Sequence, residues 1–483
     1  MQSMFIGRKA ELESLEALYR RKGPGLVVIK GRRRIGKSRL IAEFAKNYKD
    51  RSFWSFAGLA PYEGITAQDQ RDHFGRQLAA LCKLPAMTFK DWTDALEHLS
   101  LNAKPGDIIL LDEISWMGGC DRSFISKLKA WWDKQSEHLL VVFCGSVSTW
   151  IEANILNSTA FFGRVHLTIN LQPFSIAESA EFLRKIGAKN SSYDTYKILS
   201  ILGGVPWYLE QINPRLTADE NIIQLCFKKN GLLVMEFDRI FHDLFDNKGA
   251  VYKKIINSLK EGSLTLAEIR DSIQFPHSGT LSEMINHLIV AGFVVKRNLW
   301  SFKTSKPMKQ SLYHISDPYM RFYLKLIEPN LSKIINHGFL DVSLQSFPGF
   351  EVHLGLQIEY LLLQNQKFIF KAIGVNKADI VAEGPYRQTQ TTTQKGCQID
   401  YLIQTVTKNV YVCEFKFKRR ELGSEIIHEV DEKIKRLTKP TGFAFVPVLL
   451  HLSGVTDQVA TNGYFYRMID IGEFLDAMEP SGL

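Results

Sequence analysis

Four residues able to bind phosphate follow a short apolar stretch near the start of the chain. Gly31, Gly36, Lys37 and Ser38 have the spacing G-x-x-x-x-G-K-[ST] and come directly after residues 26–30. In such a loop, backbone N–H groups point at phosphate oxygens, the lysine adds charge at the β and γ phosphates, and the hydroxyl binds magnesium. Glycine lets the backbone approach the phosphates closely. The sequence therefore predicts a site for ATP with Mg²⁺.

The other residues of the loop belong to the same predicted nucleotide-binding set. They are Arg32, Arg33, Arg34, Ile35 and Arg39. The motif leaves the identity of the three consecutive arginines free. We therefore expect these arginine side chains to be solvated or to face another subunit of a homo-oligomer.

Two carboxylates end a second apolar stretch, which runs from Ile108 to Leu111. A strand here would place Asp112 at the magnesium ion and Glu113 beside an attacking water, as general base. The alternative is a strand that ends in solvated acids. A third apolar stretch, residues 139–144, leads to Ser146, which would orient water or the γ-phosphate, or would simply be a turn residue.

The order of these motifs resembles the prokaryotic AAA-type P-loop ATPases with a catalytic glutamate, akin to the STAND and origin-recognition proteins. Gly7 and Arg8 match the adenine-side box of that family, and Pro206, in Gly-Val-Pro, matches an element of its lid near the nucleotide. Arg164 matches a recurrent Gly-Arg. The resemblance implies that Arg164 reaches a phosphate, and a structural salt bridge is the alternative.

A second set of carboxylates lies near the C-terminus. Asp400 and Glu414 fall in two strand-like stretches joined by the short connection at residues 407–409, and Lys416 shares a face with Glu414 because side chains alternate along a strand. Antiparallel pairing would let the two acids share a divalent metal. The alternative is an acid and a lysine that pair at the rim of a sheet.

This arrangement resembles the PD-(D/E)xK nuclease fold. Glu359, in a predicted helix at residues 355–364, matches the helical acid of that family. The resemblance implies Mg²⁺ or Mn²⁺ at Asp400, Glu414 and Glu359, a hydroxide that attacks a phosphodiester, and Lys416 beside the reacting phosphate. A nuclease fold kept only as a scaffold is the other reading.

The elements that position these residues predict an α/β chain of four domains. Strands alternate with helices over residues 1–174, which indicates a P-loop AAA-type parallel sheet. Residues 175–245 are expected to form a helical lid. Three helical patterns and two strand-like stretches over residues 246–330 resemble a winged-helix domain, and residues 331–483 are expected to form the nuclease-like α/β domain.

The third helix of a winged helix commonly enters the DNA major groove. The predicted helix at residues 280–291 has no Lys or Arg and offers Asn286 and His287. Phosphate contacts would come from the basic wing residues, which are Lys296, Arg297, Lys303, Lys306 and Lys309. Ordinary solvated loops carry such residues too. DNA is therefore an expected partner on which the sequence does not decide.

Composition favours a globular protein of the cytoplasm. Its 45% hydrophobic and 23% charged residues are ordinary for folded domains, and the net charge of +9 over 483 residues permits a polyanionic partner without requiring one. The six cysteines have no Cys-x-x-Cys pair, so neither a zinc ribbon nor a disulfide framework is expected. No apolar stretch is long enough for a membrane helix.

Together these patterns predict an ATP-hydrolysing protein whose nucleotide state is coupled to a metal-dependent DNase-like domain. The rival hypothesis is an ATP-gated, non-catalytic scaffold for DNA binding or signalling. A third reading, a chromosomal initiator-like protein, predicts tight DNA binding without cleavage.

Overall fold

The computed structural model divides into two compact units. It describes residues 5–135, 137–146, 148–245, 249–276, 279–302, 304–336, 339, 343–388, 390, 392, 395–437 and 442–477. The first unit comprises residues up to 173 together with 283–292, and the second comprises residues 174–282 and those from 293 onward. The predicted boundaries at 174/175, 245/246 and 330/331 stay predictions.

The first unit is built on a parallel sheet of five strands in the order β2-β3-β4-β1-β5. The strands are β1 (Gly25–Lys30), β2 (Phe53–Ala57), β3 (Ile108–Asp112), β4 (Leu140–Gly145) and β5 (Leu167–Asn170). The central strands β1, β3 and β4 are apolar along almost their whole length because helices cover both faces of the sheet. The predicted parallel α/β sheet is therefore confirmed.

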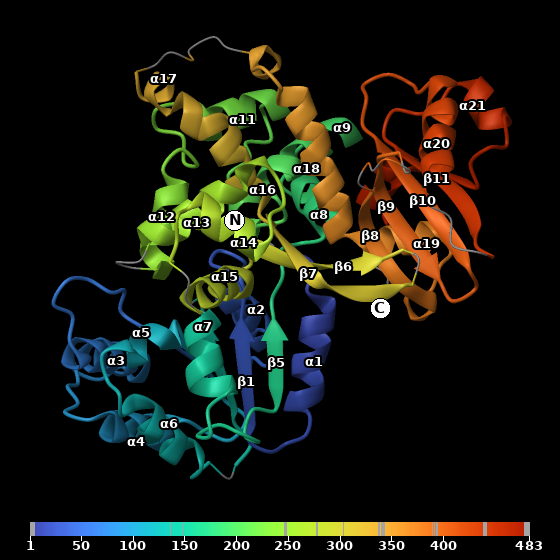
Figure 1. Ribbon diagram of the computed structural model, residues 1–483. Helices are drawn as coiled ribbons and strands as arrows, with labels where there is room; N and C mark the ends of the chain where they lie inside the picture. The colour runs from blue at the N-terminus through green and yellow to red at the C-terminus, as the bar shows by residue number, and fades with distance from the viewer. Residues whose placement is uncertain are drawn as a thin grey trace. The chain divides into compact units, whose positions relative to one another are not determined.

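Helices α1 and α2 cover one face of this sheet, and the helical segments from α3 to η1 cover the other (Figure 1). Leu26 and Val28 point toward one apolar core and Val27 and Ile29 toward the second, as strand alternation requires. The helical segments are α1 (Lys9–Tyr19), α2 (Lys37–Ala45), α3 (Ala67–Cys82), α4 (Trp92–Asn102), α5 (Ile114–Gly119), α6 (Phe124–Trp132), α7 (Ser148–Ile151) and η1 (Glu152–Leu156).

The second unit begins with the helices of the predicted lid. They are α8 (Ile176–Lys185), α9 (Ser192–Leu202), α10 (Pro206–Leu209), α11 (Ala218–Cys226) and α12 (Glu236–Phe245). Local sequence fixes several starts: Ser175 with Glu178 and Thr217 with Glu220 form capping boxes, in which each side chain bonds the other residue's backbone N–H. The prediction that this segment is mainly helical is confirmed.

Three helices and a hairpin follow, in the order expected for a winged helix. They are α13 (Gly249–Ser258), α14 (Leu266–Ser272), α15 (Thr280–Val290), β6 (Val294–Ser301) and β7 (Lys306–Ile315), with β6 and β7 antiparallel. The part of α15 from Glu283 onward falls in the first unit. A winged-helix function stays a prediction, and Lys303, one of its predicted phosphate contacts, lies outside the described residues.

The C-terminal part of the second unit is a mixed sheet in the order β12-β11-β10-β9-β8. Strands β8, β9 and β10 are antiparallel neighbours, whereas β11 and β12 run parallel to β10. The elements are α16 (Pro318–Phe322), α17 (Leu331–Ile335), α18 (Phe350–Gln364), α19 (Gln366–Ile373), β8 (Ile380–Gln388), β9 (Cys397–Thr405), β10 (Asn409–Lys416), α20 (Glu425–Arg436), β11 (Ala444–His451), α21 (Asp457–Thr461) and β12 (Arg467–Asp470). The predicted antiparallel pair around residues 407–409 is confirmed as β9 and β10.

Among the strands that the sequence patterns did not predict are β5 and β8. β5 has only one buried residue, Ile169, and β8 has two, Gly384 and Gln388. Both are edge strands, on which few apolar side chains are needed. All six cysteines are free. Within the described residues, no helix is both long and apolar enough to cross a membrane.

Candidate functional site

The phosphate-binding loop connects β1 to α2 and depends on its two glycines. Gly31 has φ +145°, and a Cβ there would lie 2.5 Å from the carbonyl oxygen of Leu171. Gly36 has φ +92° and is the N-cap of α2, with no atom near the place of a Cβ. Only glycine adopts these conformations without strain. The loop is thus left without side chains where a phosphate would approach the helix N-terminus.

Lys37 is buried in this loop, with a residue exposure of 6%. Its Nζ donates to the carbonyl oxygens of Gly31 and Arg32, each at 3.1 Å. Burial lowers the pKa of the Lys37 ammonium, against the nearby carboxylates of Glu113 and Asp112, which raise it. Because both hydrogen-bond acceptors are neutral, the buried cation fits an anionic phosphate group well.

Ser38 and Asp112 meet at the carboxyl ends of the strands. The Ser38 hydroxyl donates to Asp112 Oδ2, while Asp112 Oδ1 accepts from the Glu113 N–H at 3.0 Å. A hydroxyl and a carboxylate side by side are the oxygen donors that Mg²⁺ prefers. This pair would therefore hold the magnesium ion of a bound nucleotide.

Ser146 donates hydrogen bonds to the carboxylate of Glu113 from its backbone N–H and its hydroxyl. The Ser146 backbone N–H donates to Glu113 Oε2 at 3.0 Å, and its hydroxyl lies 2.9 and 2.8 Å from the two carboxylate oxygens. Glu113 has φ +48°, an unusual conformation for a non-glycine residue. The serine, which follows β4, therefore fixes the carboxylate that follows the neighbouring strand β3.

Gly7 and Arg8 directly precede α1, and Arg8 contacts the loop. Both have positive φ, at 65° and 60°. The Arg8 guanidinium donates to the carbonyl oxygen of Ile35 at 3.3 Å and lies 3.6 Å from Glu11. Arg8 thus ties the segment before α1 to the phosphate-binding loop, whereas adenine recognition by these residues stays a prediction.

The expectation that all three loop arginines are solvated is wrong for Arg32. Its exposure is 8%, whereas Arg33, Arg34 and Arg39 are half-buried. The motif fixes residue types only where phosphate is bound and says nothing about which other side chains turn inward.

Arg164 and Pro206, which were both expected near the nucleotide, occupy positions that have structural explanations. Arg164 forms a bidentate ion pair with Asp133, at 2.6 and 3.2 Å, and this pair lowers the pKa of Asp133 to about 2. The geometry favours the salt bridge over a phosphate contact. Pro206 is the first residue of α10 in the second unit, a position that suits proline. Its place near a nucleotide stays a prediction.

The C-terminal acids converge on neighbouring strands. Asp400 lies on β9 and accepts from the Phe415 N–H at 2.8 Å, and Glu414 lies on β10 with an exposure of 1%. Oε1 of Glu414 accepts from Lys433 at 2.5 Å and lies 3.0 Å from the Lys416 ammonium. Oε2 of Glu414 is buried and has no hydrogen-bond partner among the described residues.

Burial and mutual repulsion disfavour the charged forms of these acids. The pKa of Glu359, on α18, is raised to about 8 by burial and then by Asp400 and Glu414. Burial raises the pKa of Asp400, and burial with Asp400 raises that of Glu414, although Lys433 and Lys416 oppose both shifts. A nearby cation would relieve this repulsion.

Lys433 and Glu429 complete the cluster and were missed by the sequence patterns. Both lie on α20, four residues apart, and Glu429 accepts from Lys416 at 2.7 Å. The signal available was the amphipathic character of α20 alone, which does not reveal which strand it covers. Across the part of the chain that the structure describes, no group of three His, Cys, Asp or Glu side chains is arranged to hold a metal ion. The predicted C-terminal metal site therefore stays a proposal.

Comparison with known proteins agrees with the geometry of the first site. Residues 5–212 match the model of a family described as an ATPase domain predominantly from Archaea. This part of the chain is an archaeal-type ATPase domain. Membership of this family supports ATP binding and hydrolysis by the domain.

Two relatives and one solved structure are similar to parts of the chain. An uncharacterized protein of Methanocaldococcus jannaschii is 25% identical over 342 residues, which cover 70% of this chain and 72% of that protein. An uncharacterized ATP-binding protein of the same organism is 46% identical over 46 residues, covering 10% of this chain and 78% of that protein. The solved structure of a Walker-type ATPase from Pyrococcus abyssi matches with 16% identity and a TM-score of 0.48, covering 67% of this chain and 96% of that one.

Proposed function

We propose that the chain hydrolyses ATP with Lys37, Ser38, Asp112 and Glu113, and that its nucleotide state governs a C-terminal DNase-like domain. One observation carries the first part. The loop after β1 meets Asp112 and Glu113, at the end of β3, where the carboxyl ends of the strands lie. Ser38 donates a hydrogen bond to Asp112 there, and Ser146 donates to Glu113.

Each residue has a distinct role in this proposal. The Lys37 ammonium exchanges its two carbonyl acceptors for β- and γ-phosphate oxygens, which gain more from a positive charge. Bound Mg²⁺, held by Ser38 and Asp112, would neutralise phosphate charge. Glu113 orients the attacking water and accepts its proton once nucleotide binding releases its carboxylate from the N–H and hydroxyl of Ser146.

Two substitutions separate binding from hydrolysis. Lys37→Ala should lose most ATP affinity, whereas Glu113→Gln should keep it and slow hydrolysis by roughly 10²–10⁴-fold, the usual contribution of a general base. Calorimetric ATP titration and phosphate release measure the two effects. Lys46→Ala, which removes an exposed lysine from the far end of the same helix, is the control. Unchanged ATP affinity and hydrolysis in the Lys37→Ala chain would refute the assignment.

The second part of the proposal is metal-dependent cleavage of DNA. It is supported by three buried or half-buried acids whose pKa values are raised together, at Glu359, Asp400 and Glu414. If a divalent ion were bound by these acids, it would supply Lewis acidity toward a phosphodiester and activate water. The Lys416 ammonium lies beside Glu414 and is suited to contact a phosphate oxygen.

Cleavage assays with purified protein test this part. Asp400→Ala and Lys416→Ala should each abolish Mg²⁺- or Mn²⁺-dependent DNA cleavage, while Lys418→Ala, an exposed lysine just after β10, should not. Both active-site variants should keep ATP hydrolysis. If either variant cleaved DNA at the wild-type rate, the DNase-like assignment would be wrong.

A non-catalytic scaffold is the competing proposal, and two ion pairs of Glu414 favour it. Two lysines already neutralise Glu414 Oε1, so the cluster is partly charge-compensated without a metal ion. Titration with Mn²⁺ distinguishes the two. Binding that is lost in Asp400→Ala supports the DNase-like domain, whereas no binding supports an ATP-gated scaffold, and tight DNA binding without cleavage would favour an initiator-like role.

A further inference from the structure

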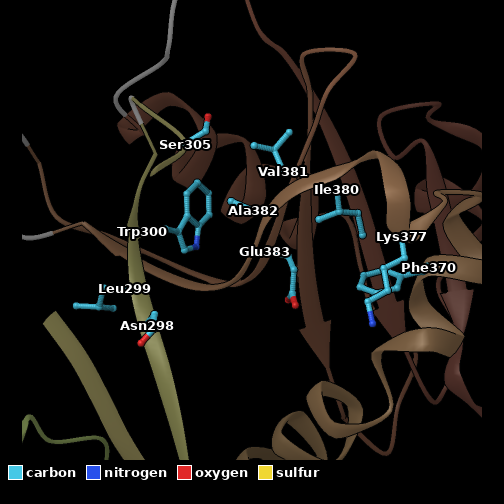
Figure 2. A pocket seen from close by; sticks show the side chains of 10 residues that line it. All are labelled: Asn298, Leu299, Trp300, Ser305, Phe370, Lys377, Ile380, Val381, Ala382 and Glu383. Carbon is cyan, nitrogen blue, oxygen red and sulfur yellow. The ribbon is translucent and has the colours of Figure 1, made fainter. Parts of the chain in front are cut away.

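A cavity of about 350 Å³ lies between the β6–β7 hairpin and the C-terminal sheet. Residues from β6, α19, the turn at Lys377 and β8 line it (Figure 2). Those with chemistry to offer are Asn298, Trp300, Phe370, Lys377 and Glu383. The volume falls in the range of about 300–1,000 Å³ that is typical of small-ligand sites. No residue of the cavity belongs to the carboxylate cluster described above.

Two aromatic side chains give the cavity surfaces for a flat ligand. Trp300 comes from β6 and Phe370 from α19, and Figure 2 shows them on opposite sides of Glu383. Trp300 is held in place by aromatic contacts with Phe302 and Tyr386, whose ring centroids lie 5.9 and 6.0 Å away. An aromatic ring fixed in this way is a platform on which a nucleobase can stack.

Glu383 supplies a carboxylate acceptor. The Tyr401 hydroxyl donates to its Oε2, and burial raises the pKa of Tyr401, so the phenol remains a donor. Within the described part of the chain, Oε1 has no hydrogen-bond donor. The carboxylate is therefore fixed by one oxygen while the other is available to a ligand.

Lys377 and Asn298 supply donors. The Lys377 side chain is exposed and forms no ion pair with any described residue. The side-chain oxygen of Asn298, Oδ1, accepts from the Ser311 hydroxyl at 2.8 Å, which leaves the side-chain NH₂ group for another acceptor. The cavity thus combines flat apolar walls, a carboxylate acceptor that interacts electrostatically with nearby Arg297, and the ammonium of Lys377.

We propose that this cavity binds a nucleobase that carries an exocyclic amine, with an attached phosphate at Lys377. The base stacks on Trp300 and its amine donates to Glu383 Oε1. Thymine fits less well, because the carbonyls flanking its N–H repel a carboxylate. The ligand is either a free nucleotide or an unpaired nucleotide of a single strand. The proposal goes beyond the proposed function, since binding requires neither ATP hydrolysis nor cleavage.

Binding measurements on the full chain in EDTA test this without cleavage. We expect dCMP, by calorimetry, or labelled oligo(dC), by fluorescence anisotropy, to bind more tightly than dTMP or oligo(dT). A preference only among the oligonucleotides assigns the site to single strands, and one already present for dCMP shows that the free nucleotide suffices. The Lys37→Ala chain should show the same preference, which would separate this site from the ATP site.

Substitutions at the cavity give the decisive result. Glu383→Gln should weaken binding of the cytosine ligands by about tenfold, the usual effect of losing a hydrogen bond to a charged group, and leave the thymine ligands unchanged or tighter. Lys377→Ala should weaken both classes equally, and Lys371→Ala, an exposed lysine on α19 outside the cavity, should weaken neither.

Two results would overturn the proposal. One is the same affinity for cytosine and thymine ligands in the wild-type chain. The other is an equal loss for both in Glu383→Gln, which would mean a structural role for the carboxylate. Loss of DNA cleavage in Asp400→Ala with an intact cytosine preference would show that the two sites are separate.

Discussion

At the scale of single residues, the state of Glu113 is set by Ser146. Both oxygens of the carboxylate are engaged by the serine, through its N–H and its hydroxyl. Ser38 and Asp112 are likewise bonded to each other, and Lys37 to backbone carbonyls. Each side chain of the candidate ATP site thus has an internal partner that nucleotide would replace.

Removing the Ser146 hydroxyl tests this restraint. In Ser146→Ala the backbone bond to Glu113 remains while the hydroxyl bonds are lost, so the carboxylate turns more freely toward water. We expect basal ATP hydrolysis to rise about threefold, the effect of a fraction of one hydrogen bond, with ATP affinity unchanged. Phosphate-release kinetics measure the rate. A slower reaction would show instead that the serine positions Glu113 productively.

At the scale of elements, the helices of the predicted lid depend on a very close backbone contact. Gly204 precedes α10, its carbonyl oxygen accepts from the Phe174 N–H at 2.7 Å, and a Cβ on it would lie 2.0 Å from the Phe174 carbonyl oxygen. The Gly-Val-Pro segment therefore has a structural reason for its glycine. This packing joins the start of α8 to the start of α10.

Two glycine substitutions in the second unit should have opposite effects. Gly204→Ala forces the backbones apart and should lower the free energy of unfolding by about 1–3 kcal/mol. Gly355→Ala, within α18 with no atom near the place of its Cβ, should raise it by about 0.5–1 kcal/mol, because alanine favours helix. Thermal unfolding followed by circular dichroism gives both signs. Equal stability of Gly204→Ala and wild type would contradict the close contact.

At the scale of the whole molecule, the chain consists of two compact units, each with its own candidate site. The archaeal-type ATPase domain contributes Lys37 and Glu113, and the mixed C-terminal sheet contributes Asp400 and Glu414. The two candidate sites are coupled only if the nucleotide bound in the first unit changes the activity of the second unit.

Coupling can be measured as a difference between nucleotide states. We expect DNA cleavage by the wild-type chain to differ by about fivefold or more between ATP and ADP, corresponding to a coupling free energy of about 1 kcal/mol or more. The Lys37→Ala chain should show no difference. Equal cleavage in the two states by the wild-type protein would leave two independent activities on one chain.

The sequence by itself predicted the candidate ATP site and the parallel sheet that carries it. The reason is that the loop spacing and the apolar strands are local patterns: Gly31 to Ser38 and Ile108 to Glu113 each lie within a few consecutive residues. The antiparallel pairing of β9 and β10 was equally local, because three residues join them.

Only the tertiary structure decided which distant side chains meet. The hold of Ser146 on Glu113, the burial of Arg32 and the arrival of Lys433 at Glu414 join residues from separate elements. The cavity between β6 and β8 is of the same kind. No periodicity encodes such contacts, since they depend on which faces of strands and helices pack together and on how far each side chain reaches.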